Sequence, residues 1–164
     1  MTTLETERLI LRPFTLDDVE GFFELGSRPN LVRYVGRHTL GSLDEAREAL
    51  IARPLRDYAV YGYGRMACIE RATGRLIGFS GLKYEPELGE TDIGYRFLED
   101  SWGKGYATEA ATASLRDGRE RLKLQRIVGV VVPENVASVR VLKKLGLVYE
   151  RSFEWDGDKV DLYA

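Results

Sequence analysis

The sequence predicts a mixed α/β fold, in which a mostly antiparallel sheet of about seven strands includes one parallel pair and carries helices on both faces. The spacing of apolar residues is helical in the first third of the chain and alternates in the middle. Residues 91–133 follow the order strand, helix, strand, a crossover that makes its two strands parallel. Short turns join the other neighbouring strands, and such turns give antiparallel hairpins.

The first third of the chain is predicted to hold one strand and two helices. Residues 7–14, ERLILRPF, alternate and are branched enough for a strand, which a proline ends. Thr15 or Asp17 can cap the helix that follows. Ser42 opens a second helix over residues 42–55, where apolar side chains recur at helical spacing.

The rest of the chain is predicted to alternate strands with helices. In order, the elements are strands 64–70, 75–84 and 91–99, a helix within 101–122, a strand 126–133, a helix within 134–147, and strands 148–157 and 158–164. The first of these helices carries a stripe of small side chains, which lets it lie close to a sheet. No linker-like segment interrupts the chain, so residues 1–164 are expected to form a single domain.

Composition argues against several classes of protein. The 164 residues include one cysteine, Cys68, and one histidine, His38, which leaves no disulfide framework and no Cys/His zinc cluster, so no metal is expected. A net charge of −2 gives no general attraction to nucleic acid. No stretch approaches the ~20 apolar residues of a membrane helix, and the first residues are charged where a signal peptide is apolar. We therefore expect a cytoplasmic protein with neither a nucleic-acid nor a membrane partner.

Residues 101–111, SWGKGYATEAA, place two glycines directly before an alanine-rich helix. The first turn of a helix presents N–H groups without partners and a partial positive charge, which together bind anions. Gly103 and Gly105 lack side chains that would keep a phosphate away, and they permit unusual backbone angles. The sequence thus predicts phosphate binding at the amides of residues 103–108. For this motif alone, a turn that merely connects a strand to a helix is the alternative.

Two other phosphate motifs do not fit this segment. A nucleotide P-loop needs a serine or threonine directly after its lysine, but Lys104 is followed by a glycine. A dinucleotide fingerprint needs a third small residue and an acidic residue about twenty positions later. Thr108 stands at the third position here, and the region near Arg126 is basic.

Several segments, in this order along nearly the whole chain, resemble the GNAT superfamily of acyl-CoA N-acyltransferases: ETERLILRPFTLDD, GRLIGFSGL, DIGYRF, WGKGYA and NVASVRVLKKLGL. The family's phosphate loop is [QR]-x-x-G-x-[GA], and WGKGYA matches it with Trp102 in place of the usual first residue. WGKGYATEA looks like the variant found in Rim-type ribosomal-protein N-terminal acetyltransferases. The implied fold is the GNAT fold, and the implied co-substrate is acetyl-CoA.

By this resemblance, the sheet splays after the strand TDIGYRFLE, and the pantetheine arm pairs there with the backbone of residues 97–99. The pyrophosphate would rest on residues 103–108. Asn135 and Ser138 match positions beside the pantetheine and the thioester sulfur, although Asn135 also suits a helix cap and Ser138 a local hydrogen bond. The residues expected to contact the cofactor are Phe97, Leu98, Glu99, Trp102, Gly103, Lys104, Gly105, Tyr106, Ala107, Thr108, Asn135 and Ser138.

Four residues are candidates for the chemistry of acyl transfer, which needs a neutral amine, a polarised thioester and a proton for the thiolate. Ser138 is the first choice for stabilising the thiolate. Family members often place a carboxylate that acts through water at the start of the splayed strand, where Glu90 and Asp92 stand. Either carboxylate also suits a surface charge. Tyr149 is a candidate proton donor or a half-buried strand tyrosine.

The resemblance implies acetyl transfer to a primary amine, on either a protein N-terminus or a small molecule. Aromatic and cationic side chains in the expected acceptor wall suggest an anionic or peptide-like acceptor, but they equally suit packing and surface positions: Arg33, Tyr34, Arg37, Arg56, Tyr58, Tyr61 and Tyr63. The alternative function is a non-catalytic acyl-CoA sensor or interaction module on the same fold. The protein is expected to be a monomer or a homodimer.

Overall fold

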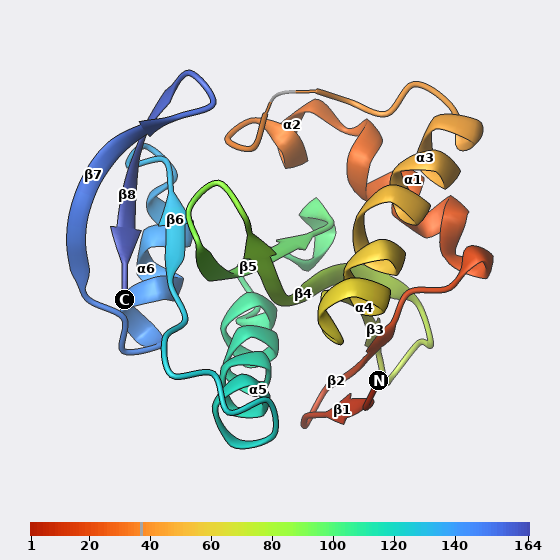
Figure 1. The fold of residues 1–164 in the computed structure, drawn as a ribbon. Helices are drawn as coiled ribbons and strands as arrows, with labels where there is room; N and C mark the ends of the chain where they lie inside the picture. Colours follow the sequence, from red (N-terminus) through yellow and green to blue (C-terminus); the bar gives the residue numbers. More distant parts are fainter. Residues whose placement is uncertain (37) are drawn as a thin grey trace.

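The structure is a computed structural model that describes residues 1–36 and 38–164. Within these residues, eight strands form two antiparallel sheets (Figure 1). The five-stranded sheet has the order β1-β2-β3-β4-β5 and the three-stranded sheet the order β6-β8-β7. The strands are β1 Leu4–Glu5, β2 Leu9–Pro13, β3 Arg65–Glu70, β4 Leu76–Glu85, β5 Glu90–Phe97, β6 Gly129–Val131, β7 Tyr149–Trp155 and β8 Asp158–Tyr163.

The α/β class and the antiparallel majority of the strands are confirmed, whereas the parallel pair does not form a ladder. β5 and β6 are edge strands of their sheets, and an isolated parallel bridge between Asp92 and Val128 links them. At this bridge, Ile93 N–H donates to Val128 C=O at 2.8 Å, and Val128 N–H donates to Thr91 C=O at 2.9 Å. On the side of β5 that faces β6, no further strand pairing follows among the described residues, so residues 93–97 form an unpaired edge there.

Six α-helices accompany the strands in the described part of the chain: α1 Val19–Ser27, α2 Pro29–Val32, α3 Leu43–Leu50, α4 Arg56–Tyr61, α5 Tyr106–Glu120 and α6 Val136–Lys144. The predicted caps are confirmed at Thr15, which forms a capping box with Asp18, and at Ser42, whose hydroxyl accepts from Glu45 N–H at 3.1 Å. The helix predicted over residues 42–55 continues into α4 through a π-helical turn. Pro54 lies in this turn, where its missing N–H fits the wider spacing of the hydrogen bonds.

Helices cover both faces of the five-stranded sheet, as predicted (Figure 1). Side chains alternate along β3, so that Met66 and Cys68 pack with Ala110 of α5. Ala67, between them, packs on the opposite face with Leu50 of α3. The two layers of core thus lie on either side of one sheet.

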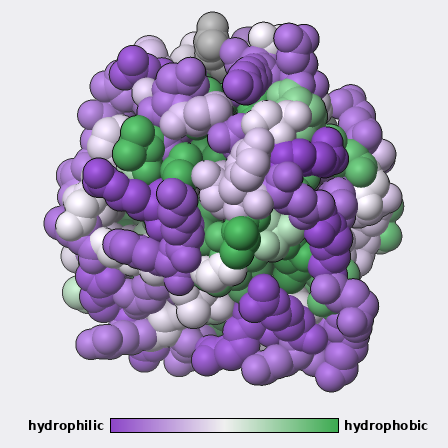
Figure 2. Space-filling model, turned by 90° about the vertical axis from the view of Figure 1, so that its left-hand side faces the viewer, coloured by the Kyte–Doolittle hydropathy of each residue, from purple (hydrophilic) through white to green (hydrophobic). Residues whose placement is uncertain are grey.

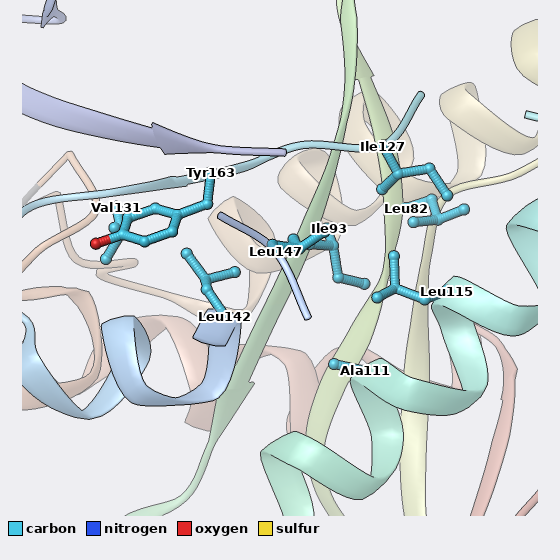
Figure 3. Packing of buried hydrophobic residues seen from close by; sticks show 9 residues of the cluster. All are labelled: Leu82, Ile93, Ala111, Leu115, Ile127, Val131, Leu142, Leu147 and Tyr163. Carbon is cyan, nitrogen blue, oxygen red and sulfur yellow. The ribbon is translucent and has the colours of Figure 1, made fainter. Parts of the chain in front are cut away.

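An apolar cluster joins the two sheets around the bridge (Figure 3). It consists of Leu82, Ile93, Ala111, Leu115, Ile127, Val131, Leu142, Leu147 and Tyr163, which come from both sheets, from α5 and from α6. Burial of these side chains fixes the relative position of β5 and β6 even though their backbones pair at one point.

The face on the left-hand side of Figure 1, where the three-stranded sheet lies, is mostly hydrophilic, with small apolar areas near its middle (Figure 2). The first four residues of β7 are exposed there. Of the helices that the structure describes, none has both the length and the apolar character needed to cross a bilayer.

Candidate active site

The unpaired edge of β5 presents backbone groups toward β6. Leu98 N–H donates to Ile77 C=O beside β4 at 2.9 Å, while Ile93 N–H donates to the opposite side, across to β6. Backbone groups alternate in direction along a strand, so the odd-numbered residues of β5 face β6. Beyond the bridge, the Ile93 C=O, both backbone groups of Tyr95 and the Phe97 N–H therefore lie on the unpaired edge.

Apart from the Phe97 N–H, these groups lie earlier in β5 than the predicted contacts at residues 97–99. Phe97 C=O accepts a hydrogen bond from the Trp102 indole Nε1 at 2.8 Å. Leu98 C=O accepts from Ser101 N–H at 2.9 Å, and Glu99 C=O from Trp102 N–H at 3.1 Å, in the 3₁₀ turn that follows β5. Both backbone groups of Leu98 and the Glu99 C=O are thus bonded within the chain, and the pairing of residues 97–99 with a pantetheine arm stays a prediction.

The glycine loop, residues 102–108, presents the amides that the sequence predicted. Residues 102–105 are exposed, and Gly103 and Gly105 have φ angles of 73° and 83°. The first backbone bond of α5 runs from Glu109 N–H to Gly105 C=O at 3.0 Å. The N–H groups of residues 103–108 donate to no other described residue, so they are available to an anion.

The conformation of the loop, rather than crowding, requires its glycines. A Cβ added at Gly103 would meet no atom within 4 Å. Its positive φ, however, is costly for any residue that carries a Cβ. The two glycines thus hold the backbone in the shape that turns successive amides outward.

The acidic residue in the first turn of α5, Glu109, forms an ion pair with Arg8. Glu109 accepts hydrogen bonds from Thr6 Oγ1 at 2.7 Å, from Arg8 N–H at 2.8 Å and from the Arg8 guanidinium at 2.7 Å. Burial raises the pKa of Glu109, but these hydrogen bonds outweigh it and the net pKa is lowered. Arg8 also donates to Lys104 C=O at 2.8 Å. The loop therefore carries a guanidinium at its side instead of an uncompensated carboxylate.

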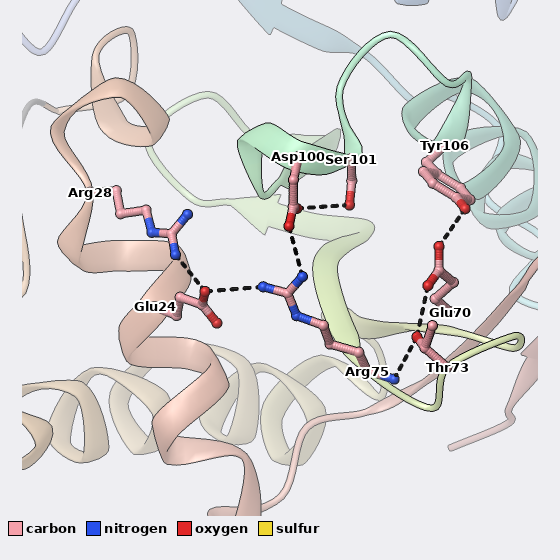
Figure 4. A network of polar contacts seen from close by, with 8 residues as sticks. All are labelled: Glu24, Arg28, Glu70, Thr73, Arg75, Asp100, Ser101 and Tyr106. Carbon is pink, nitrogen blue, oxygen red and sulfur yellow. Dashed lines mark hydrogen bonds and ion pairs between the residues drawn. The ribbon is translucent and has the colours of Figure 1, made fainter.

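A polar network fixes the glycine loop on both sides (Figure 4). Before the loop, Asp100 forms an ion pair with Arg75 at 2.8 Å. Within it, at the start of α5, Tyr106 donates its hydroxyl hydrogen to Glu70 Oε1 at 2.6 Å, and the ring of Tyr106 stacks against Phe97. The Tyr106 side chain is therefore structural, and its N–H is the group left for a ligand.

The start of α6 meets β5 through two hydroxyl groups. Asn135 caps α6, as predicted, by accepting from Ser138 N–H at 3.3 Å. The Tyr95 hydroxyl lies 2.9 Å from Ser138 Oγ and 3.0 Å from Ser138 C=O. Burial raises the pKa of Tyr95 to about 12, so this hydroxyl stays protonated at neutral pH. From the sequence, Tyr95 was predicted only to lie in a strand, with no role in the site.

The other three catalytic candidates lie apart from the unpaired edge. Asp92 is buried at the bridge, and its carboxylate pairs with Arg65 at 2.6 Å. Glu90 pairs with Arg126 at 2.9 Å on the far side of the bridge from residues 93–97. Tyr149 lies on β7, which β8 separates from β6, and its hydroxyl contacts Ser152 at 2.8 Å. The structure therefore brings Ser138 beside the unpaired residues 93–97 of β5, but neither Glu90, at the other end of that strand, nor Tyr149.

A family model described as "Acetyltransferase (GNAT) domain" matches residues 8–148 of the chain. The chain belongs to the GNAT acetyltransferase family. Its GNAT relatives include the Uncharacterized N-acetyltransferase p20 of Bacillus licheniformis, which is 32% identical over 169 residues that cover 99% of this chain and 94% of the relative. The protein is therefore an acetyltransferase.

Solved structures of acetyltransferases share this fold. The acetyltransferase from Agrobacterium tumefaciens superposes with a TM-score of 0.85 at 28% identity, covering 100% of this chain and 95% of that one. RimL, a ribosomal L7/L12 α-N-protein acetyltransferase in complex with coenzyme A, superposes with a TM-score of 0.83 at 20% identity, covering 99% and 96%. At this identity the likeness to RimL shows the fold alone, and it confirms that Rim-type proteins are among the fold neighbours.

A hollow of ≈ 430 Å³ opens in this GNAT chain between the segment around α2 and the residues that follow β6. Its lining residues are Pro29, Val32, Arg33, Tyr34, Thr39, Val132 and Glu134. Leu31 of α2 packs against Leu98, directly after β5, while Val132 directly follows β6. The hollow thus lies beside the ends of the two strands whose edges diverge.

Other residues of the expected acceptor wall have different positions. Tyr58 is half-buried, and its hydroxyl is bonded to the backbone of Phe14 and Arg65. Tyr63 lies 2.8 Å from the hydroxyl of Thr91. Arg37 lies outside the described residues. In the described part of the chain, no three or more histidine, cysteine, aspartate or glutamate side chains gather as metal ligands do.

The ion pair of Glu109 gives a pH-dependent prediction. Because the folded pKa of Glu109 is lowered, its contribution to stability is present above the unfolded pKa of about 4.3 and is lost as the pH falls through the folded value. We therefore expect Glu109→Gln to lower the urea midpoint at pH 7 and to change it far less near pH 3. The control is Glu120→Gln, at an exposed position at the end of α5. An equal loss at both pH values would contradict the assignment.

Proposed function

We propose that the protein transfers the acetyl group of acetyl-CoA to a primary amine, by direct attack of the amine within a ternary complex. The observation that carries this proposal is the adjacency of two unpaired sets of backbone groups. One set lies on the edge of β5 and the other on the glycine loop, and one short 3₁₀ turn connects them. Coenzyme A has an amide-bearing arm that ends in a pyrophosphate, which is complementary to such a pair of surfaces.

The cofactor would bind through the backbone more than through side chains. Its pyrophosphate would accept from the amides of residues 103–108, with the exposed Lys104 and the nearby Arg8 adding positive charge. The pantetheine amides would pair with Tyr95, as an added strand pairs with a sheet edge. RimL, the fold neighbour with bound coenzyme A, supports the choice of cofactor.

The transfer step would proceed without a covalent enzyme intermediate. The neutral amine attacks the thioester carbon and forms the C–N bond, the C–S bond breaks, and the nitrogen gives up one proton while the departing sulfur takes up one, so that an N-acetyl amide and the free thiol of coenzyme A result. The Tyr95 and Ser138 hydroxyls, 2.9 Å apart, would donate to that sulfur, while N–H groups of the β5 edge would stabilise the oxyanion. Since a thiol with a pKa near ~8.5 is already a fair leaving group, placement of the amine would supply more of the rate than the acid.

The amine would enter from the side of the hollow beside α2. Arg33, Tyr34 and Glu134 line it, so it offers both charges and an aromatic ring to an acceptor. A protein N-terminal α-amine and a small-molecule amine both suit such a lining. We keep both as the acceptor class.

The alternative is a non-catalytic acyl-CoA sensor on the same fold, and release of free thiol decides between the two. A panel of N-terminal peptides and small amines is incubated with acetyl-CoA, while calorimetry measures its binding. We expect binding, together with thiol release above the uncatalysed rate for at least one class of amine. Binding without release from any amine would favour the sensor, and no binding would reject both.

Gly105→Glu tests the anion site in the glycine loop. A carboxylate at this position would face the pyrophosphate, so we expect the Kd of coenzyme A to rise by about tenfold or more. The control is Gly157→Glu in the β7–β8 turn, where the glycine has the same φ of 83° and an added Cβ meets nothing within 4 Å. Calorimetric titration of both variants would refute the site if their affinities were equal.

The pair of hydroxyls at α6 gives a prediction about rates. We expect Ser138→Ala and Tyr95→Phe each to lower kcat by about tenfold and to leave the Kd of coenzyme A close to that of the parent. The double variant should lose little more than either single one, because the two hydroxyls act through one hydrogen-bonded unit. Steady-state kinetics of the three variants provides the test, and independent, multiplying losses would contradict it.

A further inference from the structure

The carboxylate of Asp92 takes a hydrogen bond that would otherwise extend the pairing of β5 with β6. In a regular parallel ladder, a bond from Ile93 N–H to Val128 C=O is followed by one from Val130 N–H to Ile93 C=O. The first of these bonds is present, at 2.8 Å. Val130 N–H, however, donates to Asp92 Oδ1 at 3.1 Å. The ladder thus stops after one bridge, at the residue whose side chain replaces the strand carbonyl.

Arg65 holds the Asp92 carboxylate in this position. Its Nη2 donates to Asp92 Oδ2 at 2.6 Å, and its Nη1 donates to Asp92 C=O at 3.0 Å and to Gly81 C=O. The two side chains are 17% and 11% exposed. Each oxygen of the carboxylate therefore has its own partner, one in β6 and one in β3.

Gly94 leaves the space in which Arg65 reaches Asp92. The two residues of β5 lie on the same face of the sheet, because side chains alternate along a strand. A Cβ at Gly94 would collide with the guanidinium of Arg65. The absence of a side chain at this one position is therefore necessary for the ion pair as it stands.

We propose that Asp92, Arg65 and Gly94 form a wedge that keeps β5 and β6 apart, and that Asp92 is a positioning residue rather than the general base. The wedge leaves the Ile93 C=O and the Tyr95 N–H without strand partners. Resting on the proposed function, these are the groups that the pantetheine arm would use. The wedge itself is a property of the unliganded chain and can be tested without any cofactor.

The hydrogen bonds of Asp92, and not its pKa, make it unsuited to accepting a proton from an amine. Burial raises the pKa of its carboxyl, while Arg65 and the Val130 N–H oppose that rise. Removing the proton of an amine would require a carboxylate oxygen turned toward the unpaired edge, but Oδ1 faces Val130 and Oδ2 faces Arg65. Lys83, which lies opposite Asp92 in the sheet, is itself paired with Glu85 at 2.8 Å.

The first experiment measures amide hydrogen exchange in the protein without cofactor. In Asp92→Ala, Val130 N–H is free to pair with Ile93 C=O, which brings Val130 C=O to the Tyr95 amide. We expect exchange at Tyr95 to slow by about tenfold or more relative to the parent. Unchanged exchange at Tyr95 in the folded variant would overturn the wedge. If the lone Arg65 charge prevents folding, the double variant Asp92→Ala/Arg65→Met removes both charges and serves instead.

The second experiment measures coenzyme A affinity in Gly94→Ala, which changes no ionisable group. Displacement of Arg65 should raise the Kd by about tenfold. The control is Arg71→Met, directly after β3, the strand that carries Arg65. It breaks an exposed ion pair with Glu5 and should bind like the parent. Unchanged affinity in Gly94→Ala would contradict the proposal. If the parent itself binds no coenzyme A, the proposed function fails, while the exchange experiment still decides on the wedge.

The third experiment separates positioning from general-base catalysis through Asp92→Asn. A positioning role predicts a raised Kd for coenzyme A and a residual kcat that keeps the acid limb of the parent's pH profile. Loss of kcat and of that limb, with the Kd unchanged, would identify Asp92 as the base and overturn the proposal.

Discussion

The site depends on hydrogen bonds that β5 and β6 do not make to each other. An unpaired strand edge is a template for any other extended chain, so it must either be covered or be reserved for a partner. Here the two edges meet at Asp92 and Val128, and beyond that bridge the backbone groups of β5 that face β6 lack strand partners among the described residues. The apolar cluster of both sheets holds the edges in place, so the unpaired edge persists without a ladder to define it.

The same strand also determines where the second set of free backbone groups lies. β5 runs into the 3₁₀ turn Glu99–Ser101, and the Trp102 indole bonds back to Phe97 C=O. Arg75 holds Asp100 before the glycine loop, and Glu70 holds Tyr106 within it, at the start of α5. An amide-rich strand edge and an anion-binding helix start are thereby kept in a fixed relation by ordinary ion pairs and hydrogen bonds. Trp102, which departs from the usual family residue, has a role in this arrangement through its indole N–H.

Sequence reasoning succeeded where local chemistry decides the structure. The caps at Thr15, Ser42 and Asn135 depend on side chains a few residues away, and all three are confirmed. The exposed amides of the glycine loop follow in the same way from two residues with positive φ. The sequence also shows that the side chains of Ile93, Tyr95 and Phe97 recur at every second position and so share one face of the strand. Applied to the backbone as well as to the side chains, it also points to the backbone groups of Tyr95 as candidates for pairing with the cofactor.

The features that could not be predicted from the sequence depend on contacts between residues far apart along the chain. Nothing near Asp92 indicates that Val130, which lies far along the chain, donates to its carboxylate in place of a carbonyl. The sequence therefore predicted a parallel pair of strands, whereas the structure has a single parallel bridge between them. Tyr149 follows the last helix in sequence, but the strand order places it on the outer strand of the second sheet. The helix expected over residues 42–55 continues past its predicted end, through the wider turn around Pro54 and into α4.

The most direct test of the account is amide hydrogen exchange at β5 and at the glycine loop, with and without saturating coenzyme A. If the unpaired edge and the loop together bind the cofactor, exchange at Tyr95, Phe97 and residues 106–108 slows together on binding. Protection of the loop amides with Tyr95 and Phe97 unchanged would contradict the account, because the cofactor would then be bound without the edge of β5.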